Sequence, residues 1–196
     1  MASPLHYLDD AQTWERERDA FVHAAIGLMA ESGTVEVQVA QVVRAAGRHN
    51  AAFYRIFGSK EGLQLAVVED AVRRTVAALE RTMARATSPE DAVRAWTRHL
   101  LGLAATDAAS GVHAIALDRY RLLRRFPDAA STISDPLRDL VAGVLTRAGL
   151  RESRVLAEAA LELVLSRQAS WIAVGRRPTA REIRTYADLS VRLVGL

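Results

Sequence analysis

The chain has 196 residues, half of them hydrophobic, a formal net charge of +3 and no cysteine. The lack of cysteine excludes disulfides and thiolate metal sites, and no apolar run is long enough to cross a membrane. The N-terminus lacks the basic-then-apolar order of a signal peptide, so a cytoplasmic location is expected. The chain is rich in Ala, Arg, Leu and Val and shows few alternating patterns, which predicts an all-α fold.

The first part of the chain contains one clear helical pattern. Residues 1–12 show no period and are expected to form a flexible arm. Thr13 is a candidate cap for a helix that runs to about Ser32 and is stopped by Gly33. Apolar residues at helical spacing, Phe21 among them, predict that this helix packs across the segment that follows.

A helix-turn-helix is predicted between Val37 and Leu63. Its first helix carries apolar residues at i, i+3, i+4 and i+7, namely Val39, Val42, Val43 and Ala46. Gly47 can adopt the left-handed conformation that ends such a helix, and helical spacing resumes at Phe53 and Phe57. Two helices joined by so short a glycine turn cross steeply, as in a helix-turn-helix.

No acid occurs between Glu36 and Glu61, and the window between them is rich in basic and polar side chains. The candidate DNA contacts in it are Arg44, Arg48, His49, Asn50, Tyr54, Arg55 and Lys60. Such a stretch around a helix-turn-helix favours contact with DNA phosphates. Since Arg suits guanine and Asn suits adenine, four of them are candidates for reading bases: Arg48, His49, Asn50 and Arg55. His49 could instead cap the second helix, and Arg44 could be plain surface.

This stretch resembles the DNA-binding segment of the TetR family of bacterial transcriptional regulators. The matching residues are Val42, Ala45-Ala46-Gly47, Phe53-Tyr54, Phe57, Ser59-Lys60-Glu61 and Leu63. The chain departs from the family pattern at the cap before the first helix (Val37 or Gln38), at Arg48-His49 and at Ala51-Ala52. The resemblance implies that Tyr54 and Lys60 contact phosphates, as an exposed phenol and a lysine at a helix N-terminus can do.

Six more helices are predicted after the turn. They span about 59–86, 89–105, 112–125, 134–149 and 152–174, and the last begins at Thr179. Ser59 and Ser88-Pro89 are typical helix starts, and Thr179 with Glu182 forms a capping box. Together with the three earlier helices this predicts nine in all.

The resemblance implies a helix-turn-helix DNA-binding domain at 13–58 and an effector-binding and dimerisation domain at 59–196. The helices at 89–105 and 112–125 each carry an apolar face with a histidine and a large aromatic residue. The candidate effector contacts are Trp96, His99, Leu103, His113, Leu117, Tyr120 and Trp171. Because few charges fall on these faces, a mostly apolar effector is expected. The alternative is that these histidines are satisfied core residues.

The helix at 152–174 is apolar over more than one face, which is typical of a helix buried on all sides. With the last helix it could form a four-helix bundle with a two-fold mate. The candidate dimer contacts are Leu161, Leu165, Ile172, Ile183, Ala187, Ser190 and Val194. The alternative is that both helices only close the core of the monomer.

The sequence therefore predicts a DNA-binding transcriptional regulator, namely a ligand-responsive repressor that binds a palindromic operator as a homodimer. The rival hypothesis is a helical small-molecule-binding or structural dimer that does not read DNA. The chain contains no Gly-rich phosphate loop, no Gly-x-Ser-x-Gly elbow and no metal-binding histidine spacing. Neither an enzyme nor a bound cofactor or metal is expected.

Overall fold

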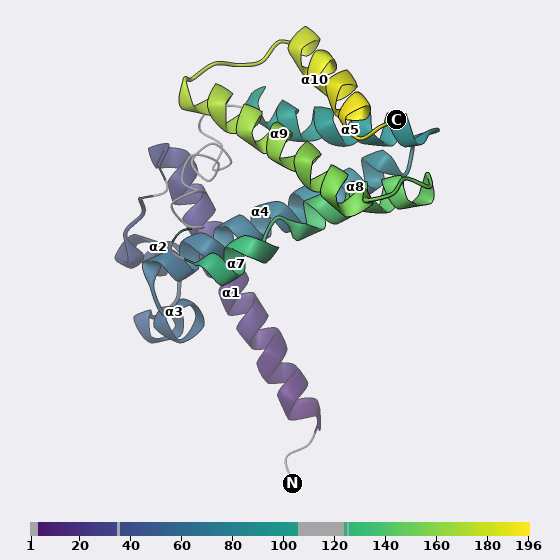
Figure 1. The fold of residues 1–196 in the computed structure, drawn as a ribbon. Coiled ribbons are helices and arrows are strands. Elements are labelled where there is room, and N and C mark those ends of the chain that lie inside the picture. The colour runs from purple at the N-terminus through teal and green to yellow at the C-terminus, as the bar shows by residue number, and fades with distance from the viewer. Residues whose placement is uncertain (1–3, 35, 106–123, 125) are drawn as a thin grey trace.

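The computed structural model describes residues 4–34, 36–105, 124 and 126–196, and every regular element among them is a helix (Figure 1). The elements are α1 (Pro4–Ser32), α2 (Val39–Ala45), α3 (Asn50–Phe57), α4 (Lys60–Met83), α5 (Pro89–Gly102), the 3-10 helix η1 (Leu103–Ala105), α7 (Pro127–Thr132), α8 (Asp135–Arg147), α9 (Ser153–Ala173) and α10 (Ala180–Leu193). The predicted all-α class is confirmed. Of these helices, none has the combination of length and apolar character that a membrane span requires.

Buried apolar side chains form two clusters, and α4 contributes to both. The first cluster joins α1, α2, α3 and the start of α4 around Phe21, Phe53 and Leu63. The second joins the rest of α4 to α5, α8, α9 and α10. Figure 1 shows α4 running from α2 and α3 at one end to α5 and α8 at the other. Since the first cluster reaches Val67 on α4, the predicted boundary after residue 58 cuts through it.

The first helix is longer than predicted. It begins at Pro4 rather than at Thr13, so residues 4–12 are helical where an arm without regular structure was expected. A proline suits the first turn of a helix because the N–H that it lacks would be unpaired there. Figure 1 shows this end of α1 projecting away from the other helices. A projecting helix needs no periodic apolar face, which is why the sequence pattern did not reveal it.

The predicted starts of α4 and α5 are confirmed. Ser59 Oγ accepts a hydrogen bond from the N–H of Gly62 at 3.1 Å, and Ser88 Oγ accepts one from the N–H of Asp91 at 3.1 Å. Each serine satisfies one of the N–H groups that a helix start leaves unpaired. Pro89 follows at the first position of α5.

One helix of the described chain was not predicted. Pro127, predicted to break a helix over 112–125, instead begins the short helix α7. Proline is compatible with either role, because it ends a preceding helix and also favours the first turn of a new one. The predicted helix over 112–125 lies outside the described residues except for Arg124, so it stays a prediction. The nine predicted helices therefore do not correspond one for one to the helices described.

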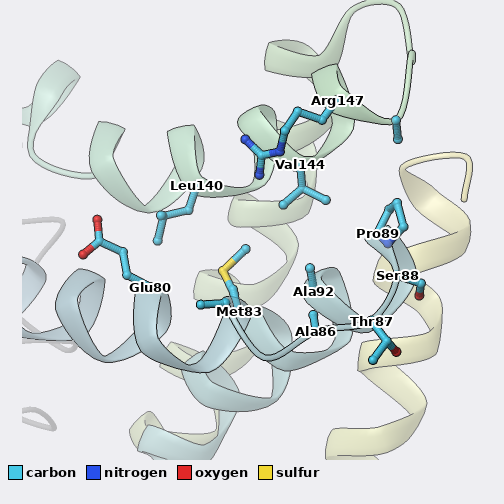
Figure 2. Close-up of a pocket in the computed structure, with 12 residues that line it drawn as sticks. Glu80, Met83, Ala86, Thr87, Ser88, Pro89, Ala92, Leu140, Val144 and Arg147 are labelled. Carbon is cyan, nitrogen blue, oxygen red and sulfur yellow. The ribbon is translucent and has the colours of Figure 1, made fainter.

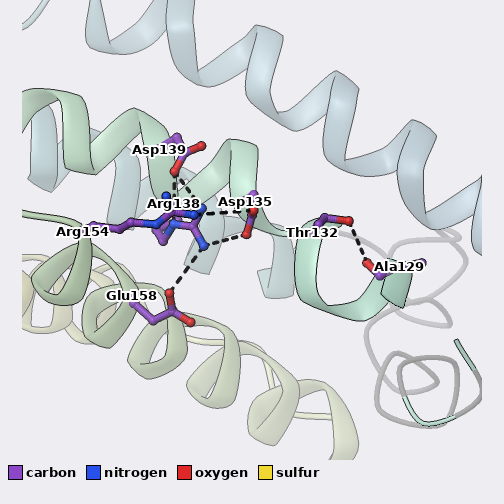
Figure 3. A network of polar contacts seen from close by, with 7 residues as sticks. All are labelled: Ala129, Thr132, Asp135, Arg138, Asp139, Arg154 and Glu158. Carbon is purple, nitrogen blue, oxygen red and sulfur yellow. Dashed lines mark hydrogen bonds and ion pairs between the residues drawn. The ribbon is translucent and has the colours of Figure 1, made fainter. Parts of the chain in front are cut away.

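A buried guanidinium holds α8 against α9 (Figure 3). Arg138, whose side chain is only 7% exposed, donates to Asp135 at 2.6 Å, to Asp139 at 2.9 Å and to Glu158 on α9 at 3.4 Å. Hydrogen bonding to Asp135 raises the pKa of Arg138 above its ordinary value. Because a buried charge is costly unless its hydrogen bonds are satisfied, this cluster restricts how α8 and α9 can pack.

The capping box predicted at the start of α10 is confirmed. Thr179 Oγ1 accepts from the N–H of Glu182 at 3.2 Å, and the Glu182 carboxylate accepts from the N–H of Thr179 at 2.9 Å. Arg176 forms an ion pair with the same carboxylate. The hydrogen bond from the Thr179 backbone, followed by the one from Arg176, lowers the pKa of Glu182 from 4.5 to about 2.

We expect this cap to weaken in acid. The folded pKa of Glu182 lies below its unfolded value, so its contribution to stability is complete above pH 4.5 and is lost as the pH falls toward 2. Thermal unfolding at several pH values should show a smaller loss of melting temperature over this range for Glu182→Gln than for the wild type. Equal losses in the two proteins would contradict the cap's role in acid sensitivity.

Candidate nucleic-acid interface

Aromatic packing fixes which face of α3 points inward. Phe53 is fully buried and meets Phe21 of α1 edge to face, with ring centroids 5.6 Å apart. Phe57, one turn later, also meets Phe21 edge to face at 5.8 Å. Such pairs favour one relative orientation of the rings in addition to burying area. Tyr54, the residue after Phe53, points to the side of this buried face and is 55% exposed.

The turn between α2 and α3 depends on Gly47. Its φ of +62° lies in the left-handed region, which a residue without Cβ adopts at no steric cost. The N–H of Gly47 donates to the carbonyl of Arg44, and the N–H of Arg48 donates to that of Val43, both at 3.1 Å. This is the hydrogen-bond pattern of a Schellman stop, which ends α2 and redirects the chain into α3.

The structure gathers the predicted DNA contacts on and around this turn. Six of them are exposed, namely Arg44, Arg48, His49, Asn50, Tyr54 and Arg55, and Lys60 is half-buried. Arg44 lies in the last turn of α2, and Asn50 is the first residue of α3. His49 occupies the N-cap position of α3, but its side chain makes no capping hydrogen bond. The alternative role of His49 as a side-chain cap therefore has no support in this geometry.

Two of these cations are paired with acids that are distant from them in the sequence. Arg55 on α3 lies 2.5 Å from the carboxylate of Glu17 on α1. Lys60 at the start of α4 forms an ion pair with Glu36, which precedes α2. Both acids lie outside the acid-free window in sequence but reach it in space. A count of Lys and Arg residues in the sequence window therefore overestimates the positive charge that this surface can offer to DNA.

Residues 21–67 match the sequence profile of the bacterial regulatory proteins of the tetR family. Residues 21–67 form a helix-turn-helix domain of the TetR family. The matched segment coincides with the first apolar cluster, which runs from Phe21 to Val67. The resemblance predicted from the sequence is confirmed, and the match extends onto α4 beyond the predicted boundary.

Solved structures of TetR-family regulators are similar in fold to this chain well beyond residues 21–67. A TetR transcriptional regulator from Rhodococcus sp. RHA1 is 23% identical with a TM-score of 0.70, covering 93% of this chain and 97% of that one. FadR from Bacillus subtilis in complex with stearoyl-CoA is 16% identical with a TM-score of 0.67, covering 89% and 96%. RolR in complex with resorcinol is 20% identical with a TM-score of 0.68, covering 95% and 91%. No curated protein sequence matches the chain.

The predicted effector contacts of this TetR-like chain divide into three groups. His113, Leu117 and Tyr120 lie outside the described residues. Trp96 is fully buried, and its indole N–H donates to the carbonyl of Leu137 on α8 at 3.0 Å. This geometry makes Trp96 part of the packing between α5 and α8.

The remaining effector candidates differ in their accessibility. Trp171 is 3% exposed and meets Tyr186 of α10 edge to face at 5.5 Å. His99 and Leu103 are half-buried, and burial lowers the pKa of His99. A neutral imidazole at this position can either donate or accept a hydrogen bond. His99 and Leu103 therefore remain predicted effector contacts.

Most of the predicted dimer contacts are covered within a single chain. Side chains of Leu161, Ile172, Ala187, Ser190 and Val194 are all 8% exposed or less. They can therefore add little buried area in a dimer, and their role as dimer contacts stays a prediction. Leu165 and Ile183 are half-buried. The apolar side chains that α9 and α10 leave exposed lie elsewhere: Val155 and Val174 at the two ends of α9, and Leu189 and Leu193 on α10.

Proposed function

We propose that the protein is a ligand-responsive transcriptional repressor that binds a palindromic operator as a homodimer through α3. One observation carries this proposal. The rings of Phe53 and Phe57 hold α3 against α1. Asn50, Tyr54 and Arg55 of the same helix are exposed next to the turn. A short helix that presents donors and cations outward in this way can enter the major groove.

A binding experiment should distinguish the proposed phosphate contacts from the proposed base contact. The DNA probe is the region upstream of the protein's own gene, followed by selection from a random duplex pool. Tyr54→Phe and Lys60→Ala should weaken binding to all sequences alike and reduce the salt slope by about one for each phosphate that the variant no longer binds. Asn50→Ala should relax preference at one base pair, at a cost of about 1–3 kcal/mol. If Tyr54→Ala combined with Lys60→Ala left affinity unchanged, the DNA-reading role of α3 would be wrong.

The proposed dimer uses the exposed faces of α9 and α10. Leu189 and Leu193 are one turn apart on α10, with 38% and 41% of their surfaces exposed. Apolar side chains spaced in this way suit an isologous helix–helix contact. Sedimentation should show a dimer for the wild type and a monomer for Leu189→Glu combined with Leu193→Glu. Because a palindromic operator is bound by two linked copies of α3, the same variant should also lose operator binding.

The proposed effector is a small, mostly apolar molecule bound by the helices beyond α4. Of the similar structures, RolR holds resorcinol and FadR holds stearoyl-CoA, and both ligands offer an apolar ring or chain. The half-buried His99 could orient such a ligand by one hydrogen bond. His99→Leu should reduce the effect of a ligand on DNA binding and leave DNA affinity without ligand nearly intact.

The acids beside α3 provide a separate test of the reading surface. Glu17→Gln and Glu36→Gln should each tighten DNA binding by about 0.5 kcal/mol per half-site, since an exposed ion pair is worth about that much. Each change frees a cation for phosphate and removes a negative charge close to the DNA. Fluorescence anisotropy at fixed salt measures the change. Glu152→Gln, at the start of α9, removes the same charge elsewhere and should have no effect. Weaker binding by Glu17→Gln would show instead that Glu17 positions Arg55.

A further inference from the structure

An open groove lies at the end of α4 that is remote from α3 (Figure 2). It has a volume of about 480 Å³, which is within the range of small-molecule sites. It is lined by the end of α4, the loop into α5, the first turn of α5 and the C-terminal half of α8: Glu80, Met83, Ala84, Ala86, Thr87, Ser88, Pro89, Ala92, Leu140, Val144, Arg147 and Ala148. We name it the α4–α8 groove. None of the predicted effector contacts lines it.

Most of the residues that line the α4–α8 groove are apolar. Met83 faces Leu140 and Val144 across it (Figure 2). The hydroxyls at its edge are already used, because Thr87 Oγ1 donates to Asp91 at 2.8 Å and Ser88 Oγ accepts from the N–H of the same residue. Charge in the groove therefore comes from two side chains, Glu80 and Arg147.

The guanidinium of Arg147 is turned back over the groove. It lies close over Gly143 of its own helix, since a Cβ at residue 143 would lie 3.3 Å from Nη1 of Arg147. Figure 2 shows the guanidinium directed toward Leu140 rather than away from α8. Within the part of the chain that the structure describes, no carboxylate forms an ion pair with Arg147. The groove thus combines an apolar surface with a cation that has no acidic partner there.

We propose that the α4–α8 groove binds a small amphipathic carboxylate. Its carboxylate would pair with Arg147, whose planar donors match two carboxylate oxygens. Its apolar body would cover Met83, Leu140 and Val144. Glu80, at the other end of the groove in Figure 2, disfavours a second negative charge on the same ligand. The residues that line it include none of the proposed DNA contacts and none of the effector contacts proposed above.

Methionine methyl groups provide a direct readout on the full-length protein. The chain has three methionines, Met1, Met29 and Met83. Met83 lines the groove, whereas Met29 is buried in the first apolar cluster. Titration of a ¹³C-methyl-methionine sample with octanoate should shift the Met83 signal and leave the Met29 signal in place. Met83→Leu assigns the signal.

Three comparisons test the chemistry of the site. Octanol, which has the same chain without the charge, should bind about tenfold more weakly than octanoate. Arg147→Gln should lower octanoate affinity about tenfold and leave octanol affinity unchanged. Octanedioate should bind more weakly than octanoate to the wild type, and Glu80→Gln should reduce that difference.

A second variant keeps the charge and changes only its position. Gly143→Ala would move the Arg147 guanidinium by a few tenths of an ångström and should weaken octanoate binding less than Arg147→Gln does. An unchanged Met29 signal in each variant confirms that the first cluster is folded. If octanoate left the Met83 signal unmoved, or if octanoate and octanol bound equally well to wild type and Arg147→Gln, the proposal would be overturned.

Discussion

Replacing Gly62 with alanine is expected to lower the free energy of unfolding by about 3 kcal/mol and to abolish DNA binding. A Cβ at residue 62 would lie 2.1 Å from the carbonyl oxygen of Phe57. That oxygen belongs to the backbone of α3, so the clash is relieved only if α3 and α4 move apart. Such a shift would draw Phe53 and Phe57 away from Phe21 and change the direction of α3.

Urea denaturation measures the stability loss, and Gly27→Ala is its matched control. Gly27 lies within α1, where an added Cβ would meet nothing within 4 Å. Alanine favours a helix interior over glycine by about 1 kcal/mol, so Gly27→Ala should raise stability by up to about that amount. If Gly62→Ala were as stable as Gly27→Ala, the close approach of α4 to the end of α3 would be wrong.

Replacing Trp96 with alanine is expected to destabilise the second cluster by about 4 kcal/mol. The indole is fully buried between α5 and α8, and its removal leaves a large cavity. The same change also leaves the carbonyl of Leu137 without the N–H that lies 3.0 Å from it. A ligand contact on a pocket wall would instead tolerate alanine and lose only its response to ligand.

Two other variants show how much of this loss of stability comes from the hydrogen bond and how much from burial. Trp96→Phe keeps most of the volume and loses the hydrogen bond, which should cost about 1–2 kcal/mol. Trp14→Ala removes a tryptophan that is 42% exposed and should change stability by about 0.5 kcal/mol or less. All three are compared by chemical denaturation. Near-native stability of Trp96→Ala would contradict a core role for this residue.

The helix-turn-helix was predictable because its determinants are local. Gly47 stops α2, Ser59 caps α4, and the spacing of Phe53 and Phe57 marks the buried face of α3. The acids that pair with its cations were not predictable in the same way. Glu17 is 38 residues from Arg55 along the chain, and only the packing of α1 across α3 brings them together.

Periodicity was also insufficient to assign the faces of α9 and α10. It identifies a helix as apolar, but burial against the same chain and burial against a second copy leave the same pattern. Leu161 and Ala187, expected at the dimer interface, are covered by helices of their own chain. Leu189 and Leu193, which were not among the predicted dimer contacts, are the apolar residues that α10 leaves exposed. The same ambiguity affected Trp96, where a core indole and a pocket indole look alike in sequence.

The continuity of α4 has a mechanical consequence. It is the only described helix with side chains in both apolar clusters, and its 24 residues make a rod about 36 Å long. If its far end is held by α5 and α8, a tilt of only about 5° displaces its first turn by about 3 Å over a rod of this length. A slight repacking of α5 and α8 that tilts α4 would thus produce a larger displacement at Lys60. In a dimer the displacements of the two α4 helices would add.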